Sequence, residues 1–308
     1  MQSTLLRIGT RGSPLALAQA EETVARLAAA HDVPRERFAI VPIKTSGDRI
    51  TDRPLADAGG KGLFTKEIEE ALLGGEIDLA VHSGKDMPTD QPPGLVLAAC
   101  LPREDVRDVF ISATANSLAD LPEGARLGTS SLRRKALALR ARPDLEVLDI
   151  RGNVQTRIAR MEEGRYDAIV LAMAGLNRLG LAARATDALD ITDFPPAVAQ
   201  GAIAIETRAD DRRVTDLIGA IDDAETRLAV TCERAFLAAL EGSCRTPIAG
   251  LAVITAGALH FSGLIITPDG RTAHETERLG AADDAAELGA DAGEELRVRG
   301  GPSFFAAA

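Results

Sequence analysis

The sequence predicts an α/β protein of two lobes, followed by a smaller α+β domain, and three observations support this prediction. Short β-rich runs alternate with helical segments over the first two thirds of the chain, which is typical of mainly parallel sheets flanked by helices. Two stretches, 98–107 and the proline-bearing 190–198, indicate crossings between lobes. Near the end, three strand-like runs separated by tight turns indicate an antiparallel sheet.

The strand candidates of the two lobes are apolar, β-rich runs. They cover residues 5–9, 38–43, 77–83, 108–112, 125–129, 145–150, 166–172 and 202–208. Helices are expected between most of them. Ser13 and Pro14 are a good N-cap and first-turn pair for a helix over 14–30. Apolar residues in helical register predict a second helix from about Leu63 to Leu73, with two glycines as its stop.

The order of these elements predicts a chain that leaves the first lobe and returns to it. The last of the strand candidates follows the second crossing, so the two lobes would be joined by a double hinge. The expected domains are 1–101 with 200–219, 104–195, and 223–308. The third would hold helices at about 224–240 and 281–297 and strands at 247–254, 258–266 and 271–278. A cleft between the two lobes is then the expected place for a ligand.

Composition excludes several classes of function. The formal charge is −11, from 35 basic and 46 acidic residues, so nucleic acid is a poor candidate partner. The chain contains no apolar run of eighteen residues without a charged residue. Its first segment, MQSTLLRIGTRGS, has no basic stretch that leads into an apolar one. We therefore expect a cytoplasmic protein without membrane contact. Cys100, Cys232 and Cys244 are odd in number and widely spaced, which supports neither a disulfide framework nor a metal site.

Three predicted strand ends lead into a helix start that bears hydroxyls or cations. The first is GTSSLRR, in which Ser130 or Ser131 is the cap and Arg133 and Arg134 follow it. The second is RGNVQTR, with Arg151 and Arg157. The third is TRGS, with Arg11 and Ser13. A helix start offers unpaired N–H groups and a positive dipole end, so added cations make it an anion site. A lone arginine is more often a solvated surface residue, but the set predicts a ligand with several carboxylates or phosphates.

Two further segments are candidates for chemistry. A strand ends at Ser83, and Lys85 and Asp86 then occupy a loop closed by a proline; at a strand end this carboxylate is a candidate catalytic group. Cys244 lies in the loop EGSCRTP, where a reactive thiolate and a structural cysteine are about equally expected. Cys232 shares a helix face with apolar residues and is expected in the core.

Eight segments, taken together and in order, resemble the porphobilinogen deaminase family. They are TRGSPLALAQ, GGKGLFTKEIE, AVHSGKDMP, GTSSLRR, RGNVQTR, AGLNRLGL, PAVAQGAIAIE and EGSCRTPI, between residue 10 and about 248. The resemblance implies two periplasmic-binding-protein-like lobes and a C-terminal domain with an antiparallel three-stranded sheet. It also implies a monomeric transferase of haem biosynthesis with a dipyrromethane cofactor, joined by a thioether to Cys244. Four porphobilinogen molecules would be deaminated and joined head to tail, and water would release hydroxymethylbilane.

The resemblance also implies roles for particular residues. Asp86 matches the family's aspartate near the pyrrole nitrogens, the expected catalytic group. Cofactor-binding positions match Ser83, Lys85, Asp86, Thr129, Ser131, Arg133 and Arg134. Substrate-binding positions match Arg11, Ser13, Gln19, Arg151, Arg157, Arg178 and Gln200. GGKGLF would be a mobile loop over the cleft. The chain departs from the family at Gly84, where a larger residue is common, and at Ala199, where glycine is common.

Two other classes of protein remain open. A non-catalytic two-lobed binding protein for a small polycarboxylate would explain the arginines, but not the third domain with its loop cysteine. A thiol hydrolase would need a histidine close to Cys244. His260 is the only histidine of that domain near enough in sequence to consider, and nothing marks it as a base.

Overall fold

The computed structural model describes residues 4–49, 62–242 and 246–306. The chain divides into two compact units, one made of Met1–Glu104 with Ala202–Arg227 and the other of Asp105–Gly201 with Leu228–Ala308. Among the described residues, no helix has the length and apolar character needed to cross a membrane.

The first unit is built on a mixed sheet. Its strand order is β2 (Phe38–Ile43), β1 (Leu6–Arg11), β3 (Leu79–Ser83), β10 (Ile203–Arg208) and β4 (Leu95–Cys100). β1 is parallel to β2 and β3, whereas β10 is antiparallel to both β3 and β4. The late strand β10 thus returns to the first sheet, as the sequence predicts.

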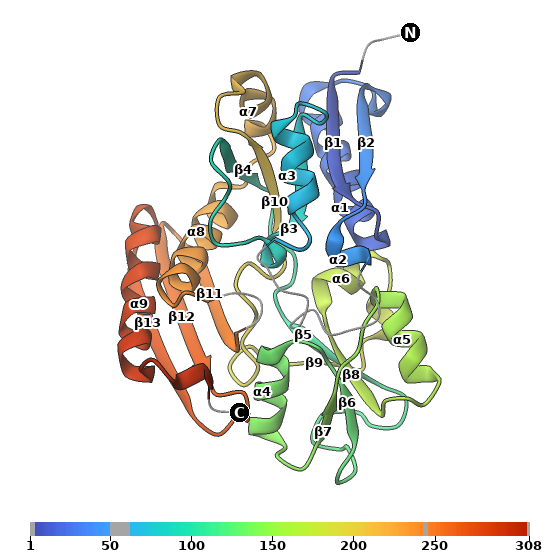
Figure 1. Ribbon diagram of the computed structural model, residues 1–308, viewed down its shortest axis with the longest axis vertical. Coiled ribbons are helices and arrows are strands. Elements are labelled where there is room, and N and C mark those ends of the chain that lie inside the picture. The colour runs from blue at the N-terminus through green and yellow to red at the C-terminus, as the bar shows by residue number, and fades with distance from the viewer. Residues whose placement is uncertain (1–3, 50–61, 243–245, 307–308) are drawn as a thin grey trace. The chain divides into compact units, whose positions relative to one another are not determined.

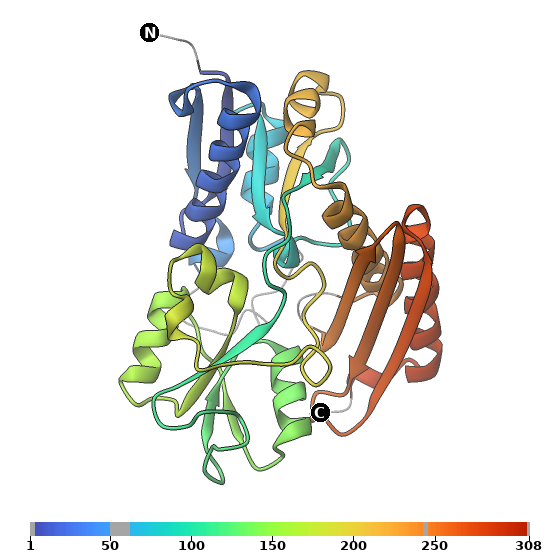
Figure 2. The ribbon, with the colours of Figure 1, turned by 180° about the vertical axis from the view of Figure 1, so that it is seen from behind.

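Helices cover both faces of this sheet. They are α1 (Pro14–His31), α2 (Ser46–Arg49), α3 (Lys66–Leu73) and α7 (Arg212–Gly219), with short 3-10 helices at Arg35–Arg37 and Gly84–Asp86. Leu79 and Val81 of β3 pack in one core with α1 and α7, while Ala80 between them packs in another core with α3. α3 lies before the sheet in Figure 1 and α1 in Figure 2. Because both faces are buried, β3 is apolar at successive positions rather than at alternate ones.

The second unit repeats this pattern of strands. Its sheet has the order β7 (Glu146–Leu148), β6 (Arg126–Gly128), β8 (Ala168–Ala172), β5 (Asp108–Ser112) and β9 (Asp187–Ala188). β6 is parallel to β7 and β8, and β5 is antiparallel to β8 and β9. The core on one face includes α4 (Leu132–Ala141); that on the other includes α5 (Val154–Glu162) and α6 (Met173–Arg178). A 3-10 helix covers Ala182–Arg184.

The C-terminal part of the chain forms an antiparallel sheet with helices on one face. The strands are β11 (Ile248–Thr255), β12 (Ala258–Ile266) and β13 (Ala273–Ala281), and the helices are α8 (Ala224–Ala239) and α9 (Ala285–Gly300). Short 3-10 helices lie at Ala282–Asp284 and Phe304–Ala306. Figure 1 shows α9 running along this sheet.

Alternation along β12 explains how this sheet is buried. Phe261 stacks on Phe236 of α8, with ring centroids 4.9 Å apart, whereas Leu264 and Ile266 on the opposite face join the core around α4. On the helical side, a Cβ added at Gly289 of α9 would lie 2.0 Å from the carbonyl oxygen of Cys232. The absence of that side chain lets α8 and α9 contact backbone to backbone.

The predicted fold class is confirmed, and one predicted connection is wrong. Residues 98–100, assigned to a crossing, belong to β4, because Leu95–Cys100 pairs with β10 despite an irregularity between Ile205 and Glu206. The helix expected from Leu63 begins at Lys66. The division into three domains stays a prediction, since its second and third domains fall in one compact unit.

Ala199 carries backbone strain that glycine would avoid. It is buried with φ +57°, and its N–H donates to Glu233 Oε2 at 2.6 Å. A non-glycine residue in the left-handed region costs the folded chain roughly 1–2 kcal/mol, and replacing it with glycine removes this cost. Glycine also makes the unfolded chain more flexible, which lowers the free energy of unfolding by about 0.5–1 kcal/mol. We expect Ala199→Gly to raise the free energy of unfolding by about 0.5–1 kcal/mol in urea titrations. Ala138→Gly inside α4 is the control and should lower it; equal losses in both variants would contradict the strain.

Candidate functional site

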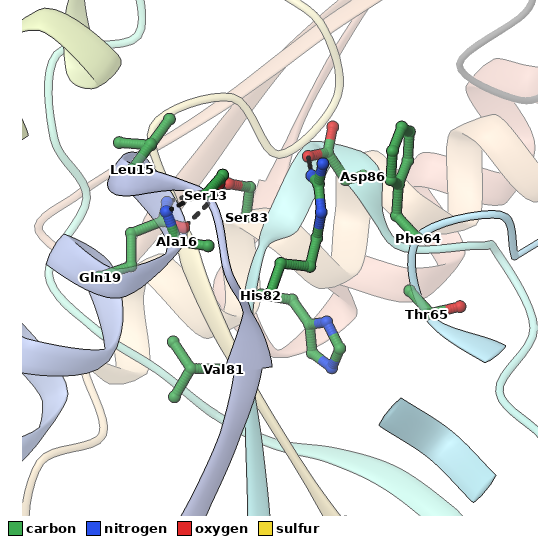
Figure 3. Close-up of a pocket in the computed structure, with 11 residues that line it drawn as sticks. Ser13, Leu15, Ala16, Gln19, Phe64, Thr65, Val81, His82, Ser83 and Asp86 are labelled. Carbon is green, nitrogen blue, oxygen red and sulfur yellow. Dashed lines mark hydrogen bonds and ion pairs between the residues drawn. The ribbon is translucent and has the colours of Figure 1, made fainter. Parts of the chain in front are cut away.

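A pocket lies at the carboxyl ends of β1 and β3 in the first unit. Parallel strands end at one edge of a sheet, so the residues that follow them are brought together there. The lining comes from the ends of β1 and β3, the start of α1 and the segment before α3 (Figure 3): Arg11, Ser13, Leu15, Ala16, Gln19, Phe64, Thr65, Val81, His82, Ser83 and Asp86. Arg11, Ser13, Gln19, Ser83 and Asp86 of the predicted site residues therefore share one pocket.

Local hydrogen bonds fix the polar wall of this pocket. Ser13 caps α1 by accepting from the backbone N–H of Ala16 at 3.3 Å, and Pro14 fits the first turn because its nitrogen has no hydrogen to leave unpaired. Gln19, buried on α1, lies with its side-chain amide nitrogen 2.9 Å from the Ser83 hydroxyl. The end of β3 is thus tied to the first turns of α1.

Opposite charges face each other in the pocket. Arg11 Nη1 lies 3.9 Å from Asp86 Oδ2, and the Arg11 guanidinium lies 4.0 Å from the centroid of the Phe64 ring. Aromatic faces attract guanidinium groups, so Phe64 helps to orient Arg11. Sequence reasoning did not assign Phe64 a role, although it is one of only eight phenylalanines in a chain without tryptophan. The first half of the predicted mobile loop GGKGLF, residues 59–61, lies outside the described residues.

Buried titratable groups lie behind the pocket wall. His82 Nε2 is 3.2 Å from Glu206 Oε2, and Glu69 of α3 is buried nearby. Burial raises the pKa of Glu69, and the Glu206 carboxylate adds to this, while the Thr65 hydroxyl and His82 act in the opposite direction. Glu69 is therefore protonated more readily than an exposed glutamate. His82 and Glu206 could have been noticed in the sequence, because each is a titratable residue within an otherwise apolar strand, IDLAVHS or AIAIETR.

In the second unit, Arg133 and Arg134 occupy the first turn of α4 behind the cap Ser131. Both side chains are buried and share the carboxylate of Asp108, with Arg133 Nη2 at 2.6 Å from Oδ2 and Arg134 Nη2 at 2.7 Å from Oδ1. Gln200 also donates to Asp108 Oδ1, at 2.9 Å. Asp108 was missed by sequence reasoning; its signal was an aspartate opening an otherwise apolar strand.

The charged groups of this cluster shift one another's pKa values. Burial alone would raise the pKa of Asp108, but the two guanidinium groups outweigh it and hold that pKa well below its usual range. Burial lowers the pKa of Arg133, helped by Arg134 and opposed by Asp108. Arg133 Nε has no hydrogen-bond partner among the described residues. Two buried cations with one anion and a spare donor suit a further carboxylate.

The other predicted site residues of the two units make local contacts. Thr129 is buried and its hydroxyl accepts from the backbone N–H of Ser131 at 3.2 Å. Arg157, in the first turns of α5, donates from Nε to the carbonyl of Gly152 at 2.8 Å, and the carbonyl of Arg151 accepts from Arg160 at 2.8 Å. Arg178 ends α6 and donates to the carbonyl of Gly201 at 3.0 Å. Lys85 lies in the turn before Asp86, outside the pocket lining.

The cysteines separate into two kinds. Cys100 and Cys232 are buried free thiols, so the prediction that Cys232 lies in the core is confirmed. Burial, with a contribution from Glu233, raises the pKa of the Cys232 thiol to about 12. Cys244 lies outside the described residues. His260 is exposed and lies 3.9 Å from Glu277. Within the described part of the chain, no group of His, Cys, Asp and Glu could hold a metal ion.

The fold and these sites define a class: a two-lobed α/β protein with cationic side chains after its strand ends, extended by an antiparallel sheet with helices. Residues 6–216 match the family model "porphobilinogen deaminase, dipyromethane cofactor binding domain", and residues 227–298 match "porphobilinogen deaminase, C-terminal domain". Porphobilinogen deaminases of Nitrobacter winogradskyi and Nitrobacter hamburgensis are each 61% identical over 301 residues, covering 98% of this chain and 95% of theirs. The chain belongs to the porphobilinogen deaminase family.

Family membership decides between the open classes. The protein is a transferase of tetrapyrrole biosynthesis that acts on porphobilinogen with a dipyrromethane cofactor, rather than a binding protein without chemistry. Among solved structures, a putative methionine-binding lipoprotein of Bacillus subtilis is 15% identical, with a TM-score of 0.45 over 72% of this chain and 91% of its own.

Glu69 gives a test of the buried groups behind the pocket. A carboxyl group with a higher pKa in the folded chain than in the unfolded chain costs stability as pH rises, because the folded chain resists its ionisation. Glu69→Gln should therefore raise the free energy of unfolding at pH 8, and this gain should vanish below about pH 4.3, the ordinary glutamate pKa. Urea titrations at several pH values measure it. Glu70→Gln, exposed on the same helix, is the control; a pH-independent loss in Glu69→Gln would contradict the expectation.

Proposed function

We propose that this enzyme deaminates four porphobilinogen molecules and joins them head to tail on a dipyrromethane attached to Cys244, releasing hydroxymethylbilane. Family membership supports the reaction, and the observation that carries the assignment of residues is the pocket in which Asp86 faces Arg11 at 3.9 Å. We place the enzyme in the cytoplasm and take it to act as a monomer, as the sequence resemblance implies.

The chemistry of the substrate matches the residues available. Porphobilinogen carries two carboxylic acid side chains, a pyrrole N–H and an aminomethyl group. Guanidinium groups bind carboxylates with charge-assisted hydrogen bonds, and a carboxylate accepts from a pyrrole N–H. The proposed substrate-binding residues are Arg11, Ser13, Gln19, Arg151, Arg157, Arg178 and Gln200. The proposed cofactor-binding residues are Ser83, Lys85, Asp86, Thr129, Ser131, Arg133 and Arg134.

Asp86 has the central role in the proposed mechanism. When the C–N bond of the protonated aminomethyl group breaks, ammonia leaves with the bonding electrons and the positive charge passes to the pyrrole ring. The carboxylate of Asp86, which lies 3.9 Å from Arg11, accepts a hydrogen bond from the pyrrole N–H and stabilises that charge. The dipyrromethane supplies a nucleophilic ring carbon and a covalent anchor. The excess cation and spare donor at Arg133 fit a group of this kind, which bears several carboxylates.

Removing the charge of Asp86 tests this role. Asp86→Asn should lower kcat by about 10²–10³-fold, the usual cost of losing one electrostatic contact to a developing charge, while intact mass still shows the cofactor. Asp86→Glu should keep partial activity because the charge survives. Tetrapyrrole formation measures both, with Asp210→Asn, an exposed aspartate of the same unit, as the control. Near-native turnover in Asp86→Asn would show that the carboxylate has no catalytic role.

Attachment to Cys244 is tested by mass spectrometry. The purified protein should be heavier than its sequence by one dipyrromethane, and substrate should add a ladder of further rings. Cys244→Ser should lose both the added mass and turnover, because a hydroxyl forms no thioether. His260→Ala should retain both, whereas a thiol hydrolase would lose activity. An unmodified wild-type chain, or a Cys244→Ser variant with native turnover, would refute the proposed attachment.

A further inference from the structure

Three titratable side chains lie buried together behind the wall of the pocket in the first unit. His82 Nε2 is 3.2 Å from Glu206 Oε2, and these two side chains are only 4% and 0% exposed. Glu69 of α3 is also buried, and the Glu206 carboxylate contributes to raising its pKa, so the two carboxyl groups interact. None of the three has a role in the mechanism proposed above.

The two carboxyl groups offer more acceptor atoms than the surrounding residues supply donors for. Glu69 Oε1 and Glu206 Oε1 are both buried, and neither has a hydrogen-bond partner among the described residues. Buried polar atoms in folded proteins are nearly always hydrogen-bonded. A proton held at this cluster reduces the shortage, because a protonated carboxyl group or imidazole donates a hydrogen bond. The cluster is therefore suited to taking up a proton.

His82 is the member of the cluster that reaches the pocket. It lines the pocket together with Asp86, and Figure 3 shows its ring on the side of the pocket where Phe64 and Thr65 lie. Because Nε2 faces Glu206, Nδ1 is the ring nitrogen that remains for proton exchange with the pocket. Imidazoles gain and lose protons near neutral pH, and a neighbouring carboxylate stabilises the protonated ring. The arrangement is that of a general base supported by an anion.

We propose that His82, supported by Glu206 and Glu69, transfers the proton that each coupling step releases. This inference rests on the proposed function. When a ring carbon attacks the deaminated substrate, a C–C bond forms and the C–H bond of that carbon breaks, with its electrons returning to the ring. The proton passes to His82 and then to the released ammonia, which leaves as ammonium. The protons balance, because the aminomethyl group of the substrate enters protonated.

The proposed role of Asp86 requires a second group for this proton. Asp86 has to stay ionised while it stabilises the cationic ring, so it does not also keep the proton that the ring carbon loses. Arg11, the other charged side chain of the pocket lining, is a guanidinium and has no lone pair to accept a proton. His82 is the remaining titratable side chain of that lining.

His82→Gln tests the role while keeping the contact with Glu206. The glutamine amide still donates a hydrogen bond, but it does not take up and return a proton at neutral pH. We expect kcat for tetrapyrrole formation to fall by about 10²–10⁴-fold, with the Tm and the cofactor mass of the wild type. His31→Gln is the matched control, since His31 lies in the same unit with Nε2 2.7 Å from the carbonyl oxygen of Leu217, and it should keep wild-type kcat. Wild-type kcat in His82→Gln would overturn the proposal.

A kinetic isotope effect shows whether the lost step is the proposed one. Porphobilinogen that carries deuterium on its free ring carbon should slow the His82→Gln variant more than it slows the wild type, because removal of that hydrogen becomes the slowest step. The double variant His82→Gln with Glu206→Gln should be no slower than the slower single variant, because the two residues act as a unit. Equal isotope effects in the variant and the wild type would overturn the proposal.

A second variant separates proton transfer from packing. In His82→Ala, added imidazole should restore part of kcat, whereas pyrazole, which has the same shape but is far less basic, should not. Equal restoration by the two rings would show that His82 only fills space and would overturn the proposal. A wild-type protein that carries no cofactor mass and forms no tetrapyrrole would instead refute the proposed function.

Discussion

The pairing of one buried carboxylate with two buried guanidinium groups constrains much of the second unit. Ionic groups can be buried only when they are paired and hydrogen-bonded, so Asp108 fixes where α4 must start relative to β5. The same contacts extend to the carbonyl of Val170 on β8 and to the carbonyl of Pro195. Two strands, a helix and the chain segment that contains Pro195 are thereby held by one set of charges.

In the first unit, the opposite charges of the candidate site are partly exposed rather than fully buried. Its sheet repeats the order of parallel strands followed by an antiparallel one, and its ligand-facing residues again follow strand ends. Arg11 and Asp86, however, are only half-buried and oppose each other across a pocket. Asp86 is proposed to stabilise charge that appears during the reaction, whereas Arg133 and Arg134 are proposed to hold a group that stays bound.

Sequence patterns were sufficient for most strands and for which segments supply site residues, because both depend on local periodicity and on strand ends. They failed where the answer depended on distant partners. The run LVLAAC could be assigned to β4 only through its pairing with β10, more than a hundred residues later. Arg133 and Arg134 were singled out as candidate site residues, but their burial against Asp108 depends on tertiary packing. Phe64 likewise acquires its role only when the segment before α3 places its ring against Arg11.

The core shared between the antiparallel sheet and α4 limits how this chain can be divided. Ala249, Leu264 and Ile266 fill the same cluster as Phe110 and Leu127. At the turn between β12 and β13, a Cβ on Gly270 would lie 2.5 Å from the carbonyl oxygen of Ala136, so the two parts meet without room for a side chain. A recombinant fragment ending at residue 201 would expose this apolar surface to water and aggregate, so the antiparallel sheet and the arginine-bearing sheet have to be expressed and engineered as a single piece.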